Sequence, residues 1–127
     1  MKRVIATTEA PAAVGPYSQA IAVGNLLFCA GQIPLDPATN EIVGIDVTTQ
    51  AERVCQNIEG VLKANGMTFA NVVKTTVFLT DLGSFAAMNA VYAKYFTEPY
   101  PARSTIQVAG LPRGAQVEIE VTAAAAE

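Results

Sequence analysis

The sequence predicts an α+β fold in which one β-sheet is covered by two helices on a single face. Two apolar runs flank a Gly-Asn pair near the N-terminus, which is typical of a β-hairpin. Two segments farther along carry apolar residues at helical spacing, and strand-like runs follow each of them. The chain has 127 residues, and we expect residues 1–127 to form one domain. The second face of the sheet is left without helices.

The N-terminal hairpin is expected over Ser18–Val23 and Leu26–Gln32. Gly24-Asn25 lies between these runs and is a two-residue turn signal. The neighbouring segments are a short strand over Met1–Ala6 and loops over Ala10–Pro16 and Pro34–Gly44. Two prolines and a glycine exclude regular structure from the first of these loops.

The strongest helix signal covers Asp46–Asn65. Its apolar residues recur every three or four positions and form one stripe, which consists of Ala51, Val54, Cys55, Ile58 and Leu62. The charged residues of the segment lie off this stripe. Asn65-Gly66 is expected to end the helix, because glycine adopts the left-handed conformation at little cost.

The C-terminal half is expected to hold a strand over Val72–Thr80, a second helix, and two closing strands over Ala102–Val108 and Gln116–Ala123. Ser84 is the expected N-cap of this helix, which runs to about Phe96. Its inner face is expected to carry Phe85, Met88, Tyr92 and either Tyr95 or Phe96. Two prolines then break the helix. We expect the two closing strands to pair as a second hairpin.

Composition limits what this protein binds. Apolar residues are 51% of the chain and the mean hydropathy is +0.32, which favours an oligomer interface that buries the surplus. No run reaches the roughly 18 apolar residues of a membrane span, so no membrane partner is expected. The net charge is −3, the pI is about 4.9 and no Lys/Arg cluster occurs, which disfavours nucleic acid. The N-terminus lacks the apolar core of a signal peptide, so we expect a cytoplasmic protein.

The sequence also limits the chemistry. Histidine is absent, which removes the commonest general base and the commonest metal ligand. Cys29 and Cys55 are far apart and lie in apolar segments. Both are therefore expected to be small buried side chains rather than metal or redox ligands. No metal site is expected.

The polar residues of the closing strands are the main site candidates. If the apolar residues of both strands point to one core, alternation places Arg103, Glu118 and Glu120 on the face away from the helices. Two interpretations remain open at this point. The group is either a cross-strand ion pair on a solvated edge or a cleft in which Arg103 binds a substrate carboxylate. In a cleft without histidine, a glutamate is the natural group to position water or shuttle a proton.

Three further residues are weaker site candidates. Tyr17 follows Gly15-Pro16 at the end of a rigid loop. Gly31 ends a strand, where a glycine permits close approach of the backbone. Asn89 lies on the apolar side of the second helix. A buried amide needs hydrogen-bond partners, so Asn89 either fixes a loop or belongs to a site.

Six motifs follow one another between about Ile5 and Thr122: Gly15-Pro16-Tyr17-Ser18-Gln19-Ala20, Ala30-Gly31-Gln32-Ile33-Pro34, Val73 to Leu79, Asn89 with Tyr92 and Phe96, Pro101-Ala102-Arg103-Ser104, and Leu111-Pro112 with Val117 to Glu120. In this order they closely resemble the RidA family, which is also called YjgF/YER057c. No single motif is decisive, but six in register are more than chance produces.

The resemblance implies a chorismate-mutase-like α+β fold that assembles as a homotrimer. In such a trimer the mixed sheets form a central barrel with the helices outside, and three clefts lie between subunits. The archetypal members are 2-iminobutanoate/2-iminopropanoate deaminases. They hydrolyse enamine and imine products of pyridoxal-phosphate enzymes to 2-keto acids and ammonia, and they need no metal or organic cofactor. The implied partner is therefore a small imino or keto acid.

The resemblance also assigns roles by position. Arg103 matches the arginine that binds the substrate carboxylate, and Glu118 matches the acid that holds the attacking water and shuttles protons. Tyr17, Gly31 and Asn89 match residues that line the cleft.

Two positions depart from the common family pattern. Thr105 stands where many bacterial members have cysteine; its backbone keeps the expected ligand contacts, but no thiol nucleophile is expected. Ala30 stands where many members carry a serine that orients substrate, which bears on rate and substrate preference.

Other functions remain open from the sequence. The same cleft fits a regulatory module that binds a small carboxylate without turnover. Ribonuclease activity, proposed for relatives, is disfavoured by the acidic pI. A passive holdase is a third alternative. The sequence leaves open the preferred imino acid, the pathway and the role of Glu120.

Overall fold

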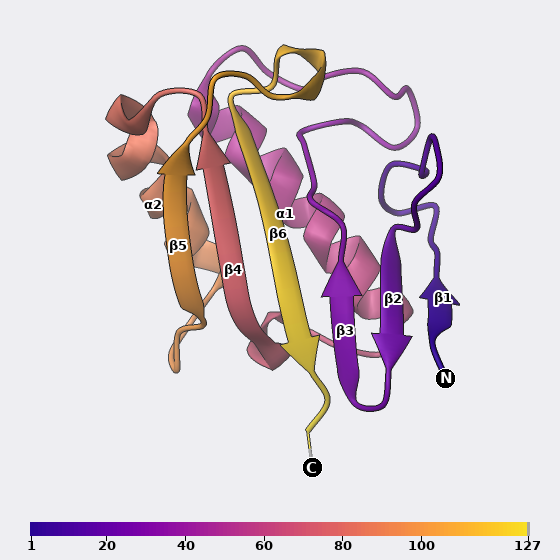
Figure 1. Cartoon of the computed structure of the whole chain (residues 1–127). Helices are drawn as coiled ribbons and strands as arrows, with labels where there is room; N and C mark the ends of the chain where they lie inside the picture. The colour runs from indigo at the N-terminus through magenta and orange to yellow at the C-terminus, as the bar shows by residue number, and fades with distance from the viewer. Residues whose placement is uncertain (127) are drawn as a thin grey trace.

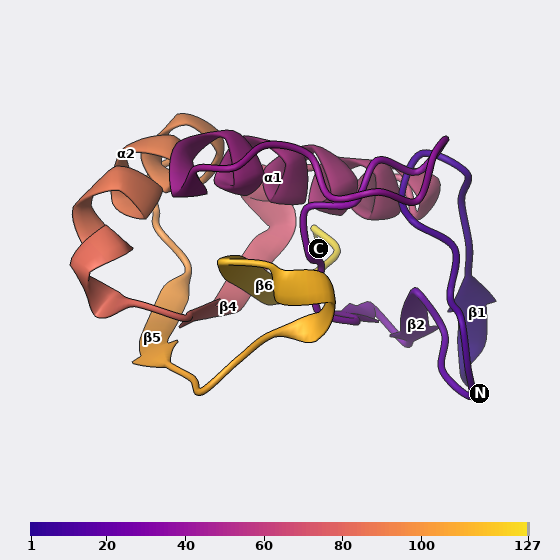
Figure 2. The ribbon, with the colours of Figure 1, turned by 90° about the horizontal axis from the view of Figure 1, so that it is seen from above.

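The computed structural model describes residues 1–126 and contains a six-stranded mixed sheet with two helices on one face (Figures 1 and 2). The strand order is β1-β2-β3-β6-β4-β5. The elements are β1 (Arg3–Ile5), β2 (Ala20–Val23), β3 (Leu26–Cys29), α1 (Val47–Ala64), β4 (Val72–Leu79), α2 (Phe85–Tyr95), β5 (Ala102–Gln107) and β6 (Val117–Ala124). The predicted α+β fold class is confirmed.

Local sequence signals placed the N-terminal half correctly. Strands β2 and β3 pair antiparallel around Gly24-Asn25, as a hairpin requires. Helix α1 begins after Asp46, whose carboxylate accepts a hydrogen bond from the Thr49 backbone N–H at 2.7 Å. It ends at Ala64 with Asn65 as its C-cap, and the residues of its predicted apolar stripe are all buried against the sheet.

The predicted C-terminal hairpin is wrong, because β5 and β6 do not pair. Strand β4 lies between them, antiparallel to β6 and parallel to β5. Thr75 of β4 is opposite both Arg103 and Val121, so Arg103 points to the same face as the buried Val121, toward the helices. Glu118 and Glu120 are opposite Phe78 and Thr76 and point to the other face. Arg103 and the two glutamates therefore lie on opposite faces of the sheet, not on one.

Helix α2 packs mainly through aromatic and sulfur-containing side chains. Met88, Tyr92 and Phe96 are buried, and the rings of Tyr92 and Phe96 stack with their centroids 4.1 Å apart. Phe85 departs from the prediction, because 37% of it remains exposed. Ser84 precedes the helix without a side-chain capping bond, so the predicted cap is present in position only.

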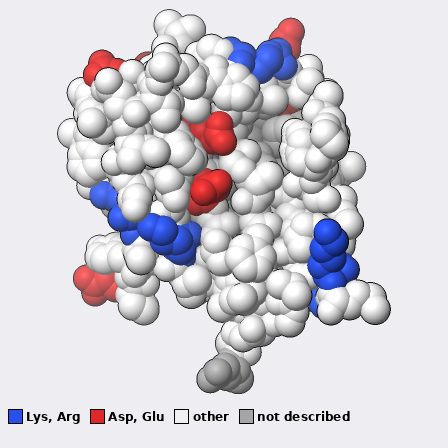
Figure 3. All heavy atoms as spheres, viewed as in Figure 1, with Lys and Arg blue, Asp and Glu red and all other residues white. Residues whose placement is uncertain are grey.

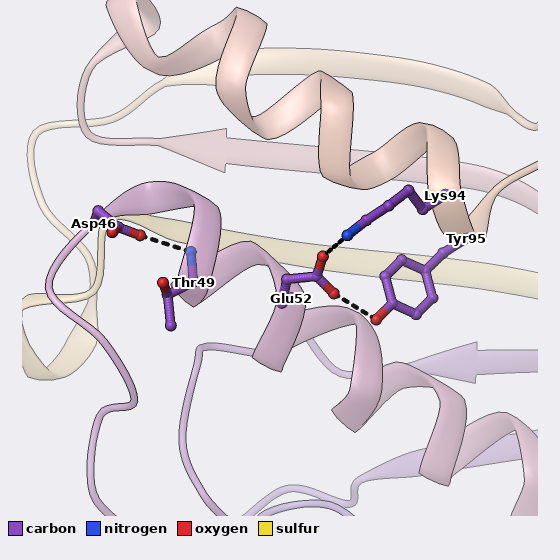
Figure 4. A network of polar contacts seen from close by, with 5 residues as sticks. All are labelled: Asp46, Thr49, Glu52, Lys94 and Tyr95. Atoms are coloured by element: carbon purple, nitrogen blue, oxygen red, sulfur yellow. Dashed lines mark hydrogen bonds and ion pairs between the residues drawn. The ribbon is translucent and has the colours of Figure 1, made fainter.

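The two helices are tied together by one carboxylate (Figure 4). Glu52 of α1 accepts hydrogen bonds from the Lys94 ammonium and from the Tyr95 hydroxyl, the latter at 2.6 Å. These two bonds hold the pKa of Glu52 below its usual value, with the Lys94 bond contributing most. The polar link fixes α2 on α1, and with it the side of α2 that faces β5.

The face of the sheet away from the helices is uncovered in the single chain. Figure 3 shows this face, where acidic side chains lie near the centre of a largely uncharged surface. Phe28 and Ile106 project from it and are 46% and 45% exposed. Exposed apolar side chains on a wide sheet face are typical of a surface that another subunit covers. Within residues 1–126, neither helix has the length and apolar character needed to cross a membrane.

Candidate functional site

The first of two hollows is formed where α2 meets the beginning of β5. It has a volume of about 400 Å³ and is lined by Asn89, Tyr92, Ala93, Tyr100, Pro101 and Arg103. Arg103 is the second residue of β5 and follows Pro101, which fixes the backbone just before the strand. Because Arg103 points to the helix face, its side chain meets α2 rather than open solvent.

Three side chains of α2 fix the Arg103 guanidinium. Arg103 donates a hydrogen bond to the amide oxygen of Asn89 at 2.6 Å. Its central carbon lies 4.7 Å from the ring centroid of Tyr92 and 5.3 Å from that of Phe85, both within cation–π range. Asn89 occupies one of five N–H donors. The arrangement therefore holds a positive charge in place while leaving donors for an anion.

The Tyr92 ring is itself anchored from below. Its hydroxyl shares a hydrogen bond of 2.8 Å with the hydroxyl of Thr75, which is completely buried in β4. Burial raises the pKa of Tyr92, so the hydroxyl keeps its proton across the physiological range. A neutral tyrosine that is fixed at both ends is a rigid platform for the guanidinium.

The second hollow lies at the other end of the candidate site, between the N-terminal loop, the end of β3 and the start of β6. Its volume is about 530 Å³. Its lining is largely apolar and comprises Pro11, Ala12, Val14, Tyr17, Gln19, Ala30, Gly31, Gln32, Ile33, Leu35, Asn40, Pro112, Arg113 and Glu118. Glu118 is the acid in this lining.

Glu118 lies directly over Gly31. A β-carbon added at Gly31 would be 2.0 Å from a carboxylate oxygen of Glu118, far inside any normal contact. The two residues are brought together by backbone hydrogen bonds of 2.9 and 3.1 Å between Gln32 and Ile119. The absence of a side chain at position 31 is therefore what gives the carboxylate its place.

Burial raises the pKa of Glu118 above its usual value, and the nearby Glu120 carboxylate raises it further. Both effects disfavour the charged form. A carboxylate whose pKa is raised accepts a proton more readily than an ordinary one. Glu120 is exposed and does not line the hollow.

Tyr17 stands at the mouth of the Glu118 hollow. It is 54% exposed, and its hydroxyl accepts a hydrogen bond from the Val14 backbone N–H at 3.2 Å. The chain reaches it through Gly15, whose φ of 125° is accessible to glycine but strained for other residues. The N-terminal loop itself therefore holds the Tyr17 ring at the edge of the hollow.

The structure places five of the six candidate residues in the two hollows. Arg103 and Asn89 line the first hollow, while Glu118, Gly31 and Tyr17 line the second. Thr105 lines neither; it is opposite the buried Val77, on the helix face. Within one chain the proposed carboxylate-binding group and the proposed proton carrier are therefore not brought together.

Part of each group was not predicted as site residues from the sequence. Phe85 and Tyr92 were expected only as core residues, although their spacing around Asn89 on one helical face was visible in the sequence. With an arginine known to be opposite that face, the two rings would have indicated a cation–π site. Gln19 and Arg113 also line the second hollow and had been given no role.

No metal site emerges from the acidic and cysteine residues. Within residues 1–126, no three histidine, cysteine, aspartate or glutamate side chains gather closely enough to hold a metal ion.

The chain is similar in sequence to proteins of one family. A family model described as "Endoribonuclease L-PSP" matches residues 7–125. DfrA of Myxococcus xanthus is 55% identical over 124 residues, with 96% of this chain and 95% of that protein covered. The 2-iminobutanoate/2-iminopropanoate deaminase of Mus musculus is 47% identical, with 97% and 91% covered. AldR of Lactococcus lactis, named as a candidate regulator, is 49% identical, with 95% and 96% covered.

Solved structures agree with these matches. A protein of the conserved Rid family from Yersinia pestis has a TM-score of 0.96 at 46% identity, with 98% of this chain and 100% of that chain covered. RidA from a Psychrobacter species has a TM-score of 0.93 at 46% identity, with 97% and 99% covered. TdcF of E. coli, with bound serine, has a TM-score of 0.92 at 42% identity, with 98% and 99% covered.

Proposed function

Since this chain belongs to the endoribonuclease L-PSP family, which includes the Rid proteins and proteins named as imine deaminases, we propose that it hydrolyses 2-imino acids to 2-keto acids and ammonia. The substrates are the small imines 2-iminobutanoate and 2-iminopropanoate, together with their enamine forms. They arise from pyridoxal-phosphate enzymes, and their hydrolysis limits the lifetime of reactive intermediates.

The separation of the two hollows is the observation that carries the proposal. Arg103 has the geometry to bind a carboxylate, and Glu118 has the surroundings of a proton carrier, but one chain keeps them on opposite faces of the sheet. We propose that a second copy covers the bare face and places its Arg103 hollow beside the Glu118 hollow of the first copy. The site is then completed between subunits of a homotrimer, in which Arg103 comes from one chain and Glu118 from its neighbour.

The proposed reaction needs orientation and one water molecule. Arg103 binds the substrate carboxylate through paired N–H donors, which fixes C2 of the substrate. Glu118 accepts a proton from water while the water oxygen bonds to C2, and the carbon–nitrogen double bond becomes a single bond. The imine is attacked in its protonated form, so Glu118 then returns its proton to the amino nitrogen of the tetrahedral intermediate. As the C2–N bond breaks and ammonia leaves, Glu118 takes the proton of the C2 hydroxyl, which becomes the carbonyl of the 2-keto acid, and this proton then passes from Glu118 to ammonia or solvent water. No cofactor takes part in these steps.

The lining residues fit a small ligand. Tyr17 and Gly31 border Glu118, and Asn89 holds Arg103, as expected of residues around one compact substrate. Thr105 is proposed to contact the ligand through its backbone, because it lies two residues from Arg103 on the same face. A serine bound to TdcF is a molecule of the same size that also carries a carboxylate.

Mixing two inactive variants tests the proposal most directly. Arg103→Ala and Glu118→Gln are each expected to abolish imine hydrolysis, measured as 2-keto acid released beside a pyridoxal-phosphate dehydratase. Co-expression of the two variants in equal amounts should restore about a quarter of the parental activity, because half of the chains supply each intact residue and every site draws on two chains. Size-exclusion chromatography with light scattering should give a trimer for the parent and both variants.

Two results would contradict the proposal. Parental activity in Arg103→Ala would remove the carboxylate-binding role of this residue. A mixture that stays inactive, although mixed trimers form, would show that Arg103 and Glu118 do not meet across subunits.

A binding protein without turnover is the second candidate, and the similarity to AldR favours testing it. Such a protein would bind 2-oxobutanoate against Arg103 in calorimetry but would not accelerate its release from the imine. RNA cleavage is tested in parallel because of the family's description. With a net charge of −3 and a pI of about 4.9, we expect no cleavage that survives both high salt and Arg103→Ala.

A further inference from the structure

Gln19, the residue just before β2, makes several side-chain hydrogen bonds to the backbone of the N-terminal loop. Its side chain is buried, with 5% of the residue exposed. The amide oxygen accepts from the Thr7 N–H at 2.7 Å. The amide nitrogen lies 3.0 Å from the carbonyl oxygen of Thr7, 3.2 Å from that of Ala10 and 2.7 Å from that of Pro11. One carboxamide thus ties down three residues of the N-terminal loop.

The tethered loop is one wall of the Glu118 hollow. Pro11, Ala12, Val14 and Tyr17 line that hollow together with Gln19 itself. On its far side the same loop presses against α1, where a β-carbon at Gly60 would lie 2.6 Å from the carbonyl oxygen of Glu9. The loop is therefore held between the Gln19 carboxamide and a glycine of the helix.

Gln19 also connects this wall to the opposite one. Its backbone carbonyl accepts a hydrogen bond of 2.9 Å from the N–H of Ala30, the residue before Gly31. Gly31 in turn is what leaves room for the Glu118 carboxylate. A single residue thus bonds through its side chain to the loop that leads to Tyr17, and through its backbone to the segment beneath Glu118.

We propose that Gln19 is a positioning residue for imine hydrolysis, one that keeps the N-terminal wall and Tyr17 at a fixed distance from Glu118. This inference rests on the proposed function of the hollow. The wall is a loop without regular secondary structure between Thr7 and Tyr17, so the Gln19 bonds replace the ladder bonds that would hold a strand. Small displacements of groups around a reacting centre reduce rates strongly.

Gln19→Met is the informative variant, because methionine keeps the length and volume of the side chain and removes all four hydrogen bonds. Gln50→Met is its matched control. Gln50 is 3% exposed, and its amide also joins backbone segments, donating to the Gly44 carbonyl at 3.1 Å and accepting from the Gln116 N–H at 2.8 Å. Gln50 does not line the Glu118 hollow. Both variants are expected to lower the thermal midpoint.

Kinetics and amide exchange then separate positioning from general stability. At temperatures well below both midpoints, Gln19→Met should lower kcat about tenfold or more. KM should change less, because the side chains that hold Arg103 are unchanged. Gln50→Met should stay within about twofold of the parental kcat. Exchange of the Thr7 amide and of the following residues to Tyr17 should accelerate in Gln19→Met but not in Gln50→Met, since Gln19 is the acceptor of that amide.

Each outcome decides a separate point. A parental kcat in Gln19→Met overturns the positioning role, and unchanged exchange over residues 7–17 overturns the tether itself. Equal losses of kcat in both variants also overturn the proposal, because they indicate a general effect. If the parental protein hydrolyses no imine, the proposed function fails instead, and the exchange comparison alone decides whether Gln19 holds the wall.

Discussion

Arg103 and Glu118 are held in opposite ways. The guanidinium is fixed by the Asn89 amide and by the rings of Tyr92 and Phe85, all from one helix. The Glu118 carboxylate lies over a bare glycine in a largely apolar hollow. Among the described residues, no hydrogen bond offsets the effects of burial and of Glu120 that raise its pKa.

This difference fits the two roles that we propose for Arg103 and Glu118. A group that binds an anion has to keep its charge and its position, and both are provided for Arg103 before any ligand arrives. A group that moves protons has to change its charge, and surroundings that weakly disfavour the carboxylate make Glu118 a stronger base. In the proposed reaction, substrate orientation and proton transfer are therefore assigned to separate parts of the sheet.

Removal of the proposed proton carrier, Glu118, is expected to have the largest effect on activity. Glu118→Gln keeps the shape of the side chain but cannot accept the proton, so kcat for imine hydrolysis should fall by roughly 10²–10⁴-fold while 2-oxobutanoate still binds. Glu120→Gln is the matched control on the same strand face. It should stay within about twofold of the parental kcat at neutral pH, because Glu120 is exposed and outside the hollow. Equal losses in the two variants would remove the distinction between these glutamates.

Moving the Glu118 carboxylate while keeping the glutamate should have the next largest effect on activity. In Gly31→Ala the new β-carbon forces the Glu118 side chain away from its place, and kcat/KM should fall by about 10²-fold. Gly110→Ala is a suitable control, since nothing lies within 4 Å of a β-carbon there. A crystal structure of Gly31→Ala should show a moved carboxylate; full activity with an unmoved carboxylate would contradict the role of the glycine.

The N-terminal and C-terminal halves of the chain show what could and could not be predicted from the sequence. The hairpin of β2 and β3 and the helix α1 follow from turn and capping signals that act over a few residues. The pairing of β5 with β4 is a long-range choice that no local signal encodes. Alternation fixes which residues of one strand share a face, but not which strands are neighbours or which face of a strand is the core face.

Ile106 is the reason why Arg103 was predicted on the wrong face of the sheet. As an apolar strand residue it was expected to point into the core, but it projects from the bare face in the same row as Phe78 and Glu118. Its apolar character fits a surface covered by another chain, and one sequence alone does not distinguish such a surface from a core. The roles of Arg103 and Glu118 came from the family resemblance and remain a proposal.

Removing a contact that holds Arg103 should affect substrate binding more than the rate of the chemical step. Asn89→Ala removes a hydrogen bond to a charged group, so KM should rise about tenfold while kcat changes little. Tyr92→Phe keeps the ring under the guanidinium and loses the hydroxyl that bonds to Thr75, so its KM should stay within about threefold. Steady-state kinetics on both variants provides the measurement. A loss of kcat in Asn89→Ala without a change in KM would argue that this region takes part in the chemistry.

The smallest expected effect is a shift in pH dependence that only the Glu118 region can produce. The ionised carboxylate is the form that accepts the proton, so kcat/KM should fall as the pH drops through the pKa of Glu118, which lies above that of an ordinary glutamate. Glu120→Gln removes the neighbouring negative charge and lowers the pKa of Glu118, which moves the acidic limb to lower pH and leaves the plateau unchanged. A limb that stays in place or moves to higher pH in Glu120→Gln would show that a group other than Glu118 sets the profile.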